Sequence, residues 1–424
     1  MTRTLYTLLL WLLWPAFALA GWRRCRKARR LGVRLPHCFK SRWGWTPPQW
    51  RSGGIWLHAV SVGESRSIFP LLQALRDRYP HLPITVTNGS VQGALQVQQH
   101  SPVAVQNSLI PYDYPFAMRR FLKRLQPKLV VIVETELWPN LYILCQRQQI
   151  PLVLINARLK NKSFRAYQRW GQPLVGQTLQ CLQLIGAQFP IDAQRFKALG
   201  APAERVRVLG NIKSDLTIPE TLPHQAHQLR AHLGKRFIWC AGSTHDGEEA
   251  QLWQAHQHLL QSHPDALLVL APRHADRFQE VATWLTKHRI PYSRRSHQAY
   301  PAPTDRVWLI DTMGELLLFY ALSDVAFVGG TLVPFGGHNI LEPAALNKPV
   351  LSGPHYGNLE ALYEAMLACG GVEILQTPQA LGARLTQLAD SPGIREQAGE
   401  RAQQCFNRLQ GALARTLKAI NHYL

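Results

Sequence analysis

The fold is decided by the stretch VAFVGGTLVPFGGHNILEPAA, residues 325–345. The apolar run at its start predicts a buried strand, and two double glycines then lead into a predicted helix. A glycine-rich turn of this kind lets backbone N–H groups and a helix N-terminus approach a phosphate. Glu342 can accept hydrogen bonds from a ribose diol, and His338 and Asn339 lie close to it in the sequence. The stretch therefore predicts a nucleotide site, although the glycines alone would equally suit a tight turn with no ligand.

Length and composition indicate a folded protein of two domains. The chain has 424 residues, more than one compact core usually holds, and 46% of them are hydrophobic. Its seven cysteines are widely spaced and include no CxxC pair, which favours a reducing compartment and argues against structural zinc. The histidines are scattered as well. We therefore expect no metal site.

Basic residues are concentrated at the N-terminus of a chain whose net charge is +21. An apolar run at 4–22 precedes the cluster RRCRKARR, residues 23–30, and the first acidic residue is Glu64. This order predicts a membrane anchor over 1–22 with a cytoplasmic flank. A cleaved signal peptide is the alternative, and Pro15 also permits a helix that enters one leaflet only. We expect an anionic membrane surface as partner and no nucleic acid, because no nucleic-acid-binding motif accompanies the charge.

Short β-rich runs alternate with helical patterns along the rest of the chain. They lie at 55–60, 84–87, 129–133, 152–155 and 184–187, and again at 237–241, 266–270, 307–310, 325–328 and 349–351. This alternation predicts α/β architecture with two doubly wound parallel sheets. The expected organisation is a basic and aromatic interfacial segment at 23–52, a first domain at 53–216, a linker at 217–236, a second domain at 237–395, and a C-terminal helix at 396–424 that returns to the first domain.

Candidate functional residues follow strands, because parallel α/β sheets bind ligands at the carboxyl ends of their strands. Glu64 lies in SVGES, residues 61–65, at a predicted helix start, where it suits either a general base toward a sugar hydroxyl or an ordinary first-turn acid. Glu134 and Glu136 would point in opposite directions on an extended segment, so only one of them need face the site. The segment DTMGE, residues 311–315, predicts an N-capped helix start. Groups that suit a leaving phosphate follow strands at Ser243 and Arg273, and Lys213 lies at the junction of the two predicted domains.

The order of these motifs resembles that of one family of glycosyltransferases. The likeness is carried by SVGE at 61–64, ETELWPN at 134–140, NARL at 156–159, STHDGE at 243–248, PRH at 272–274, DTMGEL at 311–316, FVGG at 327–330, GGHN at 336–339 and LEPAA at 341–345. With the N-terminal anchor and its basic flank, these segments cover nearly the whole chain in order. The chain resembles the 3-deoxy-D-manno-octulosonic acid (Kdo) transferases of lipid A biosynthesis.

The resemblance implies a GT-B fold, with two Rossmann-like domains facing a cleft, in an enzyme on the cytoplasmic face of the inner membrane of a Gram-negative bacterium. It implies transfer of Kdo from CMP-Kdo to lipid IVA in lipopolysaccharide biosynthesis, with inversion and without a metal or cofactor. Glu64 would be the general base, and Gly63 would give it room. Arg273 and Lys213 would hold the phosphate or the Kdo carboxylate. Glu136 would lie on the acceptor side, and the donor would contact Ser243, Met313, Gly314, Glu315, Asn339 and Glu342.

Two other functions remain open at the level of the sequence. The chain also suits another GT-B enzyme with a different nucleotide-sugar donor, which hydrolysis of CMP-Kdo against UDP-sugars would distinguish. Its charge suits a non-catalytic membrane-bound binder of lipid or nucleic acid on the same scaffold, which would show no activity dependent on Glu64. The loop at 331–335 is less polar than we expect for the family.

Overall fold

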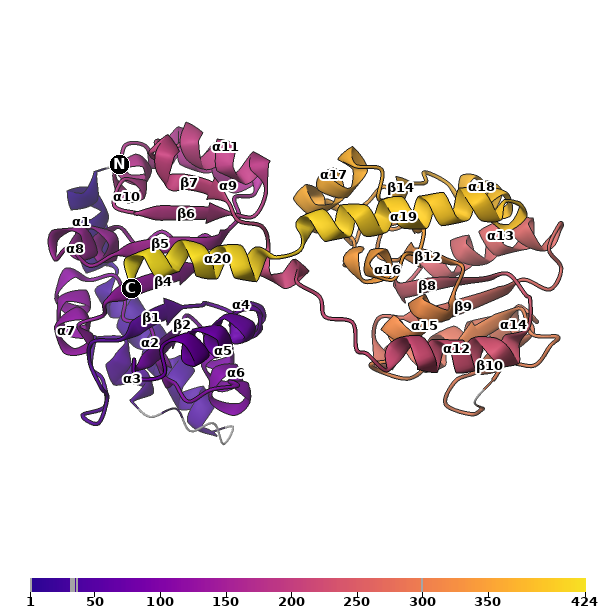
Figure 1. Cartoon of the computed structure of the whole chain (residues 1–424). Coiled ribbons are helices and arrows are strands. Elements are labelled where there is room, and N and C mark those ends of the chain that lie inside the picture. The colour runs from indigo at the N-terminus through magenta and orange to yellow at the C-terminus, as the bar shows by residue number, and fades with distance from the viewer. Residues whose placement is uncertain (1, 31–34, 36, 299) are drawn as a thin grey trace. The chain divides into compact units, whose positions relative to one another are not determined.

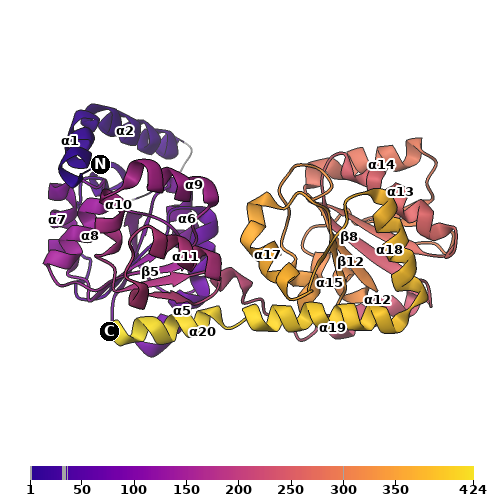
Figure 2. The same ribbon diagram turned by 90° about the horizontal axis from the view of Figure 1, so that it is seen from above.

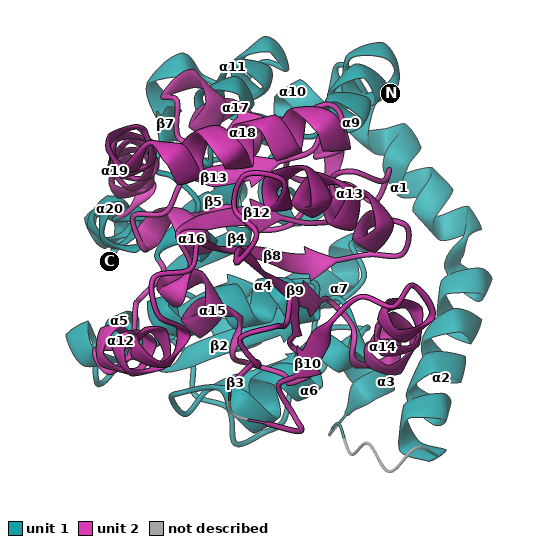
Figure 3. Cartoon of the chain, turned by 90° about the vertical axis from the view of Figure 1, so that its right-hand side faces the viewer, with its two compact units in different colours: residues 1–215, 411–424 teal, residues 216–410 magenta. Residues whose placement is uncertain are grey.

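The computed structural model describes residues 2–30, 35, 37–298 and 300–424, which form two compact units. Unit 1 contains residues 1–215 and 411–424, and unit 2 contains residues 216–410 (Figure 3). Each unit has its own sheet of seven strands, and every strand pair in both sheets is parallel. The predicted α/β architecture with two doubly wound parallel sheets is confirmed.

The sheet of unit 1 has the strand order β3-β2-β1-β4-β5-β6-β7 (Figure 1). Helices cover both faces, so the central strands are apolar along their length. Successive residues alternate between the faces: Trp56 and Ile132 pack on one side, and Leu57 and Val131 on the other. The strands are β1 (Ile55–His58), β2 (Ile84–Asn88), β3 (Gln106–Leu109), β4 (Leu129–Val133), β5 (Leu152–Ala157), β6 (Leu184–Ala187) and β7 (Val206–Val208).

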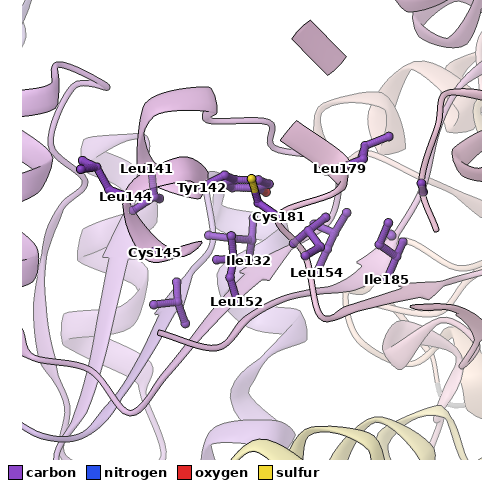
Figure 4. Packing of buried hydrophobic residues seen from close by; sticks show 14 of the residues in the cluster. Ile132, Leu141, Tyr142, Leu144, Cys145, Leu152, Leu154, Leu179, Cys181 and Ile185 are labelled. Carbon is purple, nitrogen blue, oxygen red and sulfur yellow. The ribbon is translucent and has the colours of Figure 1, made fainter. Parts of the chain in front are cut away.

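The helices of unit 1 divide between these two faces. In the core of one face, shown in Figure 4, Tyr142, Cys145 and Cys181 pack with Ile132 and Leu154. This face is covered by α7 (Pro115–Leu125), α8 (Pro139–Arg147), α10 (Leu174–Leu179) and α11 (Pro190–Ala198). The other face is covered by α5 (Phe69–Arg78), α6 (Val91–His100) and α20 (Ala412–Ile420). The shorter helices of the unit are α3 (Cys38–Ser41), α4 (Val62–Ser67) and α9 (Asn161–Ala166).

Unit 2 repeats this plan with the strand order β10-β11-β9-β8-β12-β13-β14. Trp239, Leu268 and Phe327 lie at the centre of its core. Its strands are β8 (Ile238–Thr244), β9 (Leu267–Pro272), β10 (Tyr292–Arg294), β11 (Val307–Leu309), β12 (Val325–Val328), β13 (Val350–Ser352) and β14 (Glu373–Ile374). Its helices are α12 (Leu222–Leu233), α13 (Glu248–Leu260), α14 (Phe278–Lys287), α15 (Leu316–Leu322), α16 (Leu341–Ala345), α17 (Glu360–Ala368), α18 (Pro378–Asp390) and α19 (Pro392–Leu409).

The N-terminal apolar run forms two helices rather than the single anchor helix predicted over 1–22. The helices α1 (Arg3–Leu12) and α2 (Trp14–Arg30) meet at a bend of 59°. Among the described residues, no single helix is long and apolar enough to cross a membrane. Taken together as a bent pair, α1 and α2 have the length and composition to do so. Both lie along one side of unit 1 (Figure 2), where Tyr112 Oη donates to the Phe17 carbonyl at 3.1 Å and Tyr114 Oη to the Leu10 carbonyl at 2.6 Å.

The chain passes between the units twice, after residue 215 and after residue 410. The predicted linker at 217–236 contains α12, which belongs to unit 2. The single C-terminal helix predicted at 396–424 is in fact two helices, α19 in unit 2 and α20 in unit 1, with Gly411 between them at φ 80°. Asp215 accepts the N–H groups of Ala412 at 3.1 Å and Leu413 at 2.6 Å. Asp215, the last residue before the chain leaves unit 1, therefore caps α20, the helix that forms when the chain returns to unit 1.

Two disulfides are present: Cys25–Cys38 joins α2 to α3, and Cys369–Cys405 joins the residue after α17 to the last part of α19. The remaining cysteines are free and buried: Cys145, Cys181 and Cys240. The prediction of a reducing compartment did not anticipate these bonds. Spacing along the chain does not report them, because tertiary packing decides which thiols meet.

Candidate active site

Glu64 lies at the carboxyl edge of the unit 1 sheet, in the first turn of α4 directly after β1. Ser61 caps this helix: its Oγ accepts the Glu64 N–H at 3.3 Å and donates to Glu64 Oε1 at 2.8 Å. The Val60 N–H donates to Glu64 Oε2 at 2.6 Å. Burial raises the pKa of Glu64, and these two hydrogen bonds to its oxygens oppose that rise. The carboxylate is thus fixed in one orientation with an increased affinity for a proton, as a general base requires.

Gly63 leaves open the space next to Glu64. A Cβ added at this position would meet no described atom closer than Ser61 Oγ at 4.0 Å. Packing within unit 1 therefore does not demand a glycine here. The space is available to a group that approaches the helix N-terminus from outside.

Three carboxylates gather at this edge, because Glu134 and Glu136 follow β4 beside Glu64. Burial, followed by the charges of Glu64 and Glu134, raises the pKa of Glu136 to about 7. The expectation that Glu134 and Glu136 point in opposite directions assumed an extended segment. The chain instead bends at Glu134, whose φ is +60°, so the alternation of a strand ends there, and the charge of Glu134 acts on Glu136 together with that of Glu64.

Lys213 partly neutralises this cluster. Its Nζ lies 2.6 Å from Glu134 Oε1, in a pair whose side chains are 43% and 27% exposed. The short helix that carries it, Ile212–Ser214, is held by Asn156 Oδ1, which accepts the Ile212 N–H at 3.0 Å. The structure thus brings the predicted Lys213 to the carboxylates of unit 1.

A cavity of about 370 Å³ lies at the carboxyl edge of the unit 2 sheet. Its wall includes five of the residues that the sequence placed at the donor site: Ser243, Arg273, Met313, Gly314 and Glu342. Ser243 and Arg273 come from the ends of β8 and β9, and Met313 and Gly314 from the turn before α15. Gly314 has φ +87°, and a Cβ there would meet no described atom within 4 Å, so the turn is open to a ligand.

Glu342 lies in the first turn of α16, a helix of five residues. Asn339 Nδ2 donates to Glu342 Oε1 at 3.5 Å, and Asn339 Oδ1 accepts the Leu341 N–H at 3.1 Å. Burial raises the pKa of Glu342, against the opposing effects of Asn339 and Arg273. Asn339 therefore orients Glu342 toward the cavity edge rather than lining the cavity itself.

Glu315, like Asn339, is a predicted donor residue that does not line this cavity. Its carboxylate pairs with Arg295 Nη2 at 2.9 Å and accepts the Thr312 hydroxyl. Arg295 is the main cause of the lowered pKa of Glu315. The predicted N-cap, Asp311, instead pairs with Arg294 Nε at 2.7 Å, and α15 begins at Leu316 without a side-chain cap.

Glu248, which the sequence analysis did not single out, holds the glycine-rich loop that follows β12. Its buried carboxylate accepts the N–H groups of Gly330 at 2.6 Å and of Thr331, Leu332 and His245 at 2.9 Å each. The loop amides expected to bind a phosphate are therefore occupied by Glu248. A signal was present in the sequence, because Glu248 opens a helix after β8 as Glu64 does after β1.

The loop at 331–335 is apolar because it packs within unit 2. Leu332 joins the core, and Phe335 stacks on His245 with ring centroids 3.6 Å apart. His245 Nε2 in turn lies 2.7 Å from His338 Nε2. Burial and His245 lower the pKa of His338 to about 4, so this ring is neutral at pH 7. His338 of the GGHN motif is thus a neutral ring that contacts His245, the residue on which Phe335 of the loop stacks.

Comparisons with known proteins find relatives of this chain over most of its length. Residues 37–216 match the family described as 3-deoxy-D-manno-octulosonic-acid transferase (kdotransferase). The 3-deoxy-D-manno-octulosonic acid transferase of Haemophilus influenzae is 40% identical over 380 residues, which are 89% of this chain and 88% of that protein.

Two solved structures are also similar. The C-terminal CMP-Kdo binding domain of WaaA from Acinetobacter baumannii is 35% identical, covers 45% of this chain and all of that domain, and has a TM-score of 0.43. The UDP-GlcNAc 2-epimerase of Neisseria meningitidis, solved with UDP-GlcNAc, covers 86% of this chain and 100% of that one, with a TM-score of 0.55 at 14% identity. The second likeness concerns the fold alone.

Proposed function

Because the chain belongs to the family of 3-deoxy-D-manno-octulosonic acid (Kdo) transferases, and is therefore a glycosyltransferase, we propose that it moves Kdo from CMP-Kdo to lipid IVA with inversion at the anomeric carbon. The observation that carries this proposal is Glu64, a half-buried carboxylate oriented by Val60 and Ser61 at the carboxyl edge of the first sheet. Lipid IVA is the precursor to which the family resemblance points.

In the proposed reaction, Glu64 accepts the proton of an acceptor hydroxyl. The hydroxyl oxygen forms a bond to the anomeric carbon of Kdo while the bond from that carbon to the phosphate oxygen breaks. The electron pair of that bond leaves with CMP. A single displacement of this kind inverts the configuration, and the open space at Gly63 lets the hydroxyl approach. Glu136, with its pKa of about 7, belongs to the acceptor side of the same edge.

On the donor side, the cavity of unit 2 suits a nucleoside monophosphate. Arg273 offers a planar set of donors that matches a phosphate or carboxylate. Glu342, oriented by Asn339, suits the two hydroxyls of a ribose. Cationic donors positioned at the leaving phosphate stabilise the charge that develops there. Glu315 has no part in this assignment, because Arg295 and Thr312 hold its carboxylate.

Lys213 keeps its proposed role toward the Kdo carboxylate or the phosphate. An ammonium has three N–H donors, and Glu134 is the one carboxylate within ion-pairing distance of it in the described chain. We further propose that the reaction needs no metal, since the guanidinium of Arg273 lines the donor cavity and can match a leaving group with a single phosphate.

The decisive experiment follows the acceptor by mass spectrometry. The detergent-purified protein is supplied with lipid IVA and with CMP-Kdo generated in place. We expect the acceptor to gain the mass of one or more Kdo groups. A parallel reaction with UDP-sugars should give none. An unchanged acceptor, with protein that melts cooperatively and binds CMP, would overturn the donor and acceptor assignment while leaving the family intact.

The pH dependence of transfer gives a test of the base. The charge of Glu134 raises the pKa of Glu64, and that of Lys213 lowers it. Because the base must be ionised, E134Q should move the acid limb of kcat/KM to lower pH and K213M should move it to higher pH. Both partners are partly exposed, so the shifts should shrink at high ionic strength. Profiles that shift in the same direction would contradict the assignment of Glu64.

We also propose that α1 and α2 attach the protein to the cytoplasmic face of the inner membrane. Leu8 and Leu12 are 60% and 77% exposed on α1.

The variant L8S/L12S should bind phospholipid vesicles at least about tenfold more weakly, because two leucines no longer enter the bilayer. Its melting temperature should not change, since the contacts of Leu10 and Phe17 with unit 1 remain. The control I394S, on an exposed position of unit 2, should bind like the wild type. Equal binding of all three proteins would argue against the anchor.

A further inference from the structure

Unit 1 contains a cavity of its own, of about 370 Å³, that no step of the proposed reaction uses. Its wall is formed by α2 with Arg24 and Lys27, by Arg42, and by the beginning of α6. No carboxylate lines it in the described chain. Three cations around a cavity without an acid produce a strongly positive potential in it. They repel one another, and a bound anion would relieve that repulsion.

Arg42 is the least expected member of this wall. The residue is only 6% exposed, and its guanidinium donates to two neutral acceptors, the carbonyls of Ile110 at 3.0 Å and Gly89 at 2.5 Å. It also lies over the ring of Tyr112, 5.3 Å from the centroid. Within the described residues, no carboxylate lies within ion-pairing distance of it. Since buried charges are ordinarily paired, this cation lacks the counter-ion that its burial calls for.

The beginning of α6 adds positive potential to the same cavity. This helix has ten residues, and its N-cap Ser90 accepts the Gly93 N–H at 3.0 Å. Val91 and Gln92 line the cavity, and their N–H groups precede the first intrahelical hydrogen bond, that from Ala94 to Ser90. The positive end of the helix dipole therefore acts on the cavity together with the three cations.

The cavity lies between the apolar N-terminal helices and the catalytic edge. On one side, Leu19 and Trp22 of α2 are 47% and 45% exposed. On the other side, the N–H groups of Gly89 and Ser90 donate to the Val60 carbonyl at 3.2 and 3.1 Å, and the Val60 N–H donates to Glu64. One residue, Val60, thus connects the wall of the cavity to the proposed base, through its carbonyl on one side and its N–H on the other.

We propose that this cavity binds the phosphate of a membrane lipid, held by Arg24, Lys27, Arg42 and the first amides of α6. Guanidinium groups and a helix N-terminus are the groups that proteins use for phosphates. The inference deepens the proposed function, on which it rests for the presence of a membrane lipid next to α2. The phosphate belongs either to the acceptor or to a phospholipid around the enzyme, and the two arms of the test separate these sources.

The first arm measures binding of the full-length protein to phosphatidylcholine vesicles doped with phosphatidic acid. R24Q/K27Q changes two exposed residues, and R23Q/R29Q removes the same charge from exposed positions of α2 outside the cavity. Both lose the general attraction to an anionic surface. R24Q/K27Q should lose about tenfold more affinity than the control, the equivalent of one phosphate contact. With a fatty acid in place of phosphatidic acid, the two variants should be equal.

The second arm measures the acceptor in phospholipid-free detergent. If the bound phosphate is that of the acceptor, R24Q/K27Q should raise the acceptor KM about tenfold with kcat unchanged, and R23Q/R29Q should not. If it is that of a phospholipid, the KM stays constant and only the vesicle effect remains. Equal behaviour of the two variants in both arms overturns the proposal. Because the vesicle arm does not require transfer, a failure of the proposed reaction would be recognised separately.

Discussion

The variant E64Q should lose transfer by about 10²- to 10⁴-fold in kcat, the range attributed to a general base, with its affinity for CMP unchanged. Glutamine keeps the size of the side chain and can still accept a hydrogen bond from Val60 or Ser61, but it cannot take the proton of the acceptor. The residues that line the donor cavity all belong to unit 2 and are not altered. Single-turnover transfer and calorimetry with CMP measure the two quantities.

Two further variants separate a chemical role from a structural one. E204Q removes an exposed carboxylate of unit 1 and should transfer Kdo like the wild type. S61A leaves the carboxylate of Glu64 but removes its hydrogen bond and the cap of α4, so it should cost only about 1 kcal/mol of unfolding free energy and part of the rate. Retained turnover in E64Q would show that another group accepts the proton.

The variant E248Q should lower the unfolding free energy of unit 2 by about 3 kcal/mol, because a buried charged acceptor of several hydrogen bonds is replaced by a neutral amide. For a unit of this size the melting temperature falls by roughly 6–12 °C. The loop at Gly330 and Thr331 loses its anchor, and with it the support of the donor site. CMP affinity should therefore fall as well, even though Glu248 does not line the cavity. Calorimetric melting and CMP titration test both effects.

E400Q is the matched control for this variant, since Glu400 is an exposed carboxylate of α19 in the same unit. It should melt and bind CMP as the wild type does. If E248Q kept its stability but lost CMP binding, Glu248 would have to act on the ligand directly. If it lost neither, the loop would be held by its packing through Leu332 and Phe335 alone.

The strands that could be predicted from the sequence are those with neighbours on both sides. Such strands carry apolar runs, because helices cover both faces and other strands cover both edges. The strands that were missed are the four at the edges of the two sheets: β3, β7, β10 and β14. Their sequences, such as QNSL in β3 and YSR in β10, are short and polar. An edge strand has one neighbour and faces solvent, so its residues give no apolar signal.

The sequence predicts which loops contribute to the site. It predicts less well which side chains of those loops face the cavity. The rule that ligands bind after strands placed Ser243, Arg273 and Glu342, which line one cavity. It could not tell that Glu315 turns away toward Arg295, because the partner comes from another strand end. Nor could it show that the loop amides serve Glu248, since that contact joins residues about eighty positions apart.

The cap that Asp215 provides for α20 has a consequence for synthesis on the ribosome. A chain emerges from its N-terminus and its domains fold as they appear, so residues 216–410 are complete while unit 1 still lacks its final helix. The first unit to begin is thus the last to be finished. A nascent chain carries the first sheet without its last covering helix throughout the translation of unit 2, and a message truncated before codon 411 yields a protein that lacks one helix on the face covered by α5 and α6.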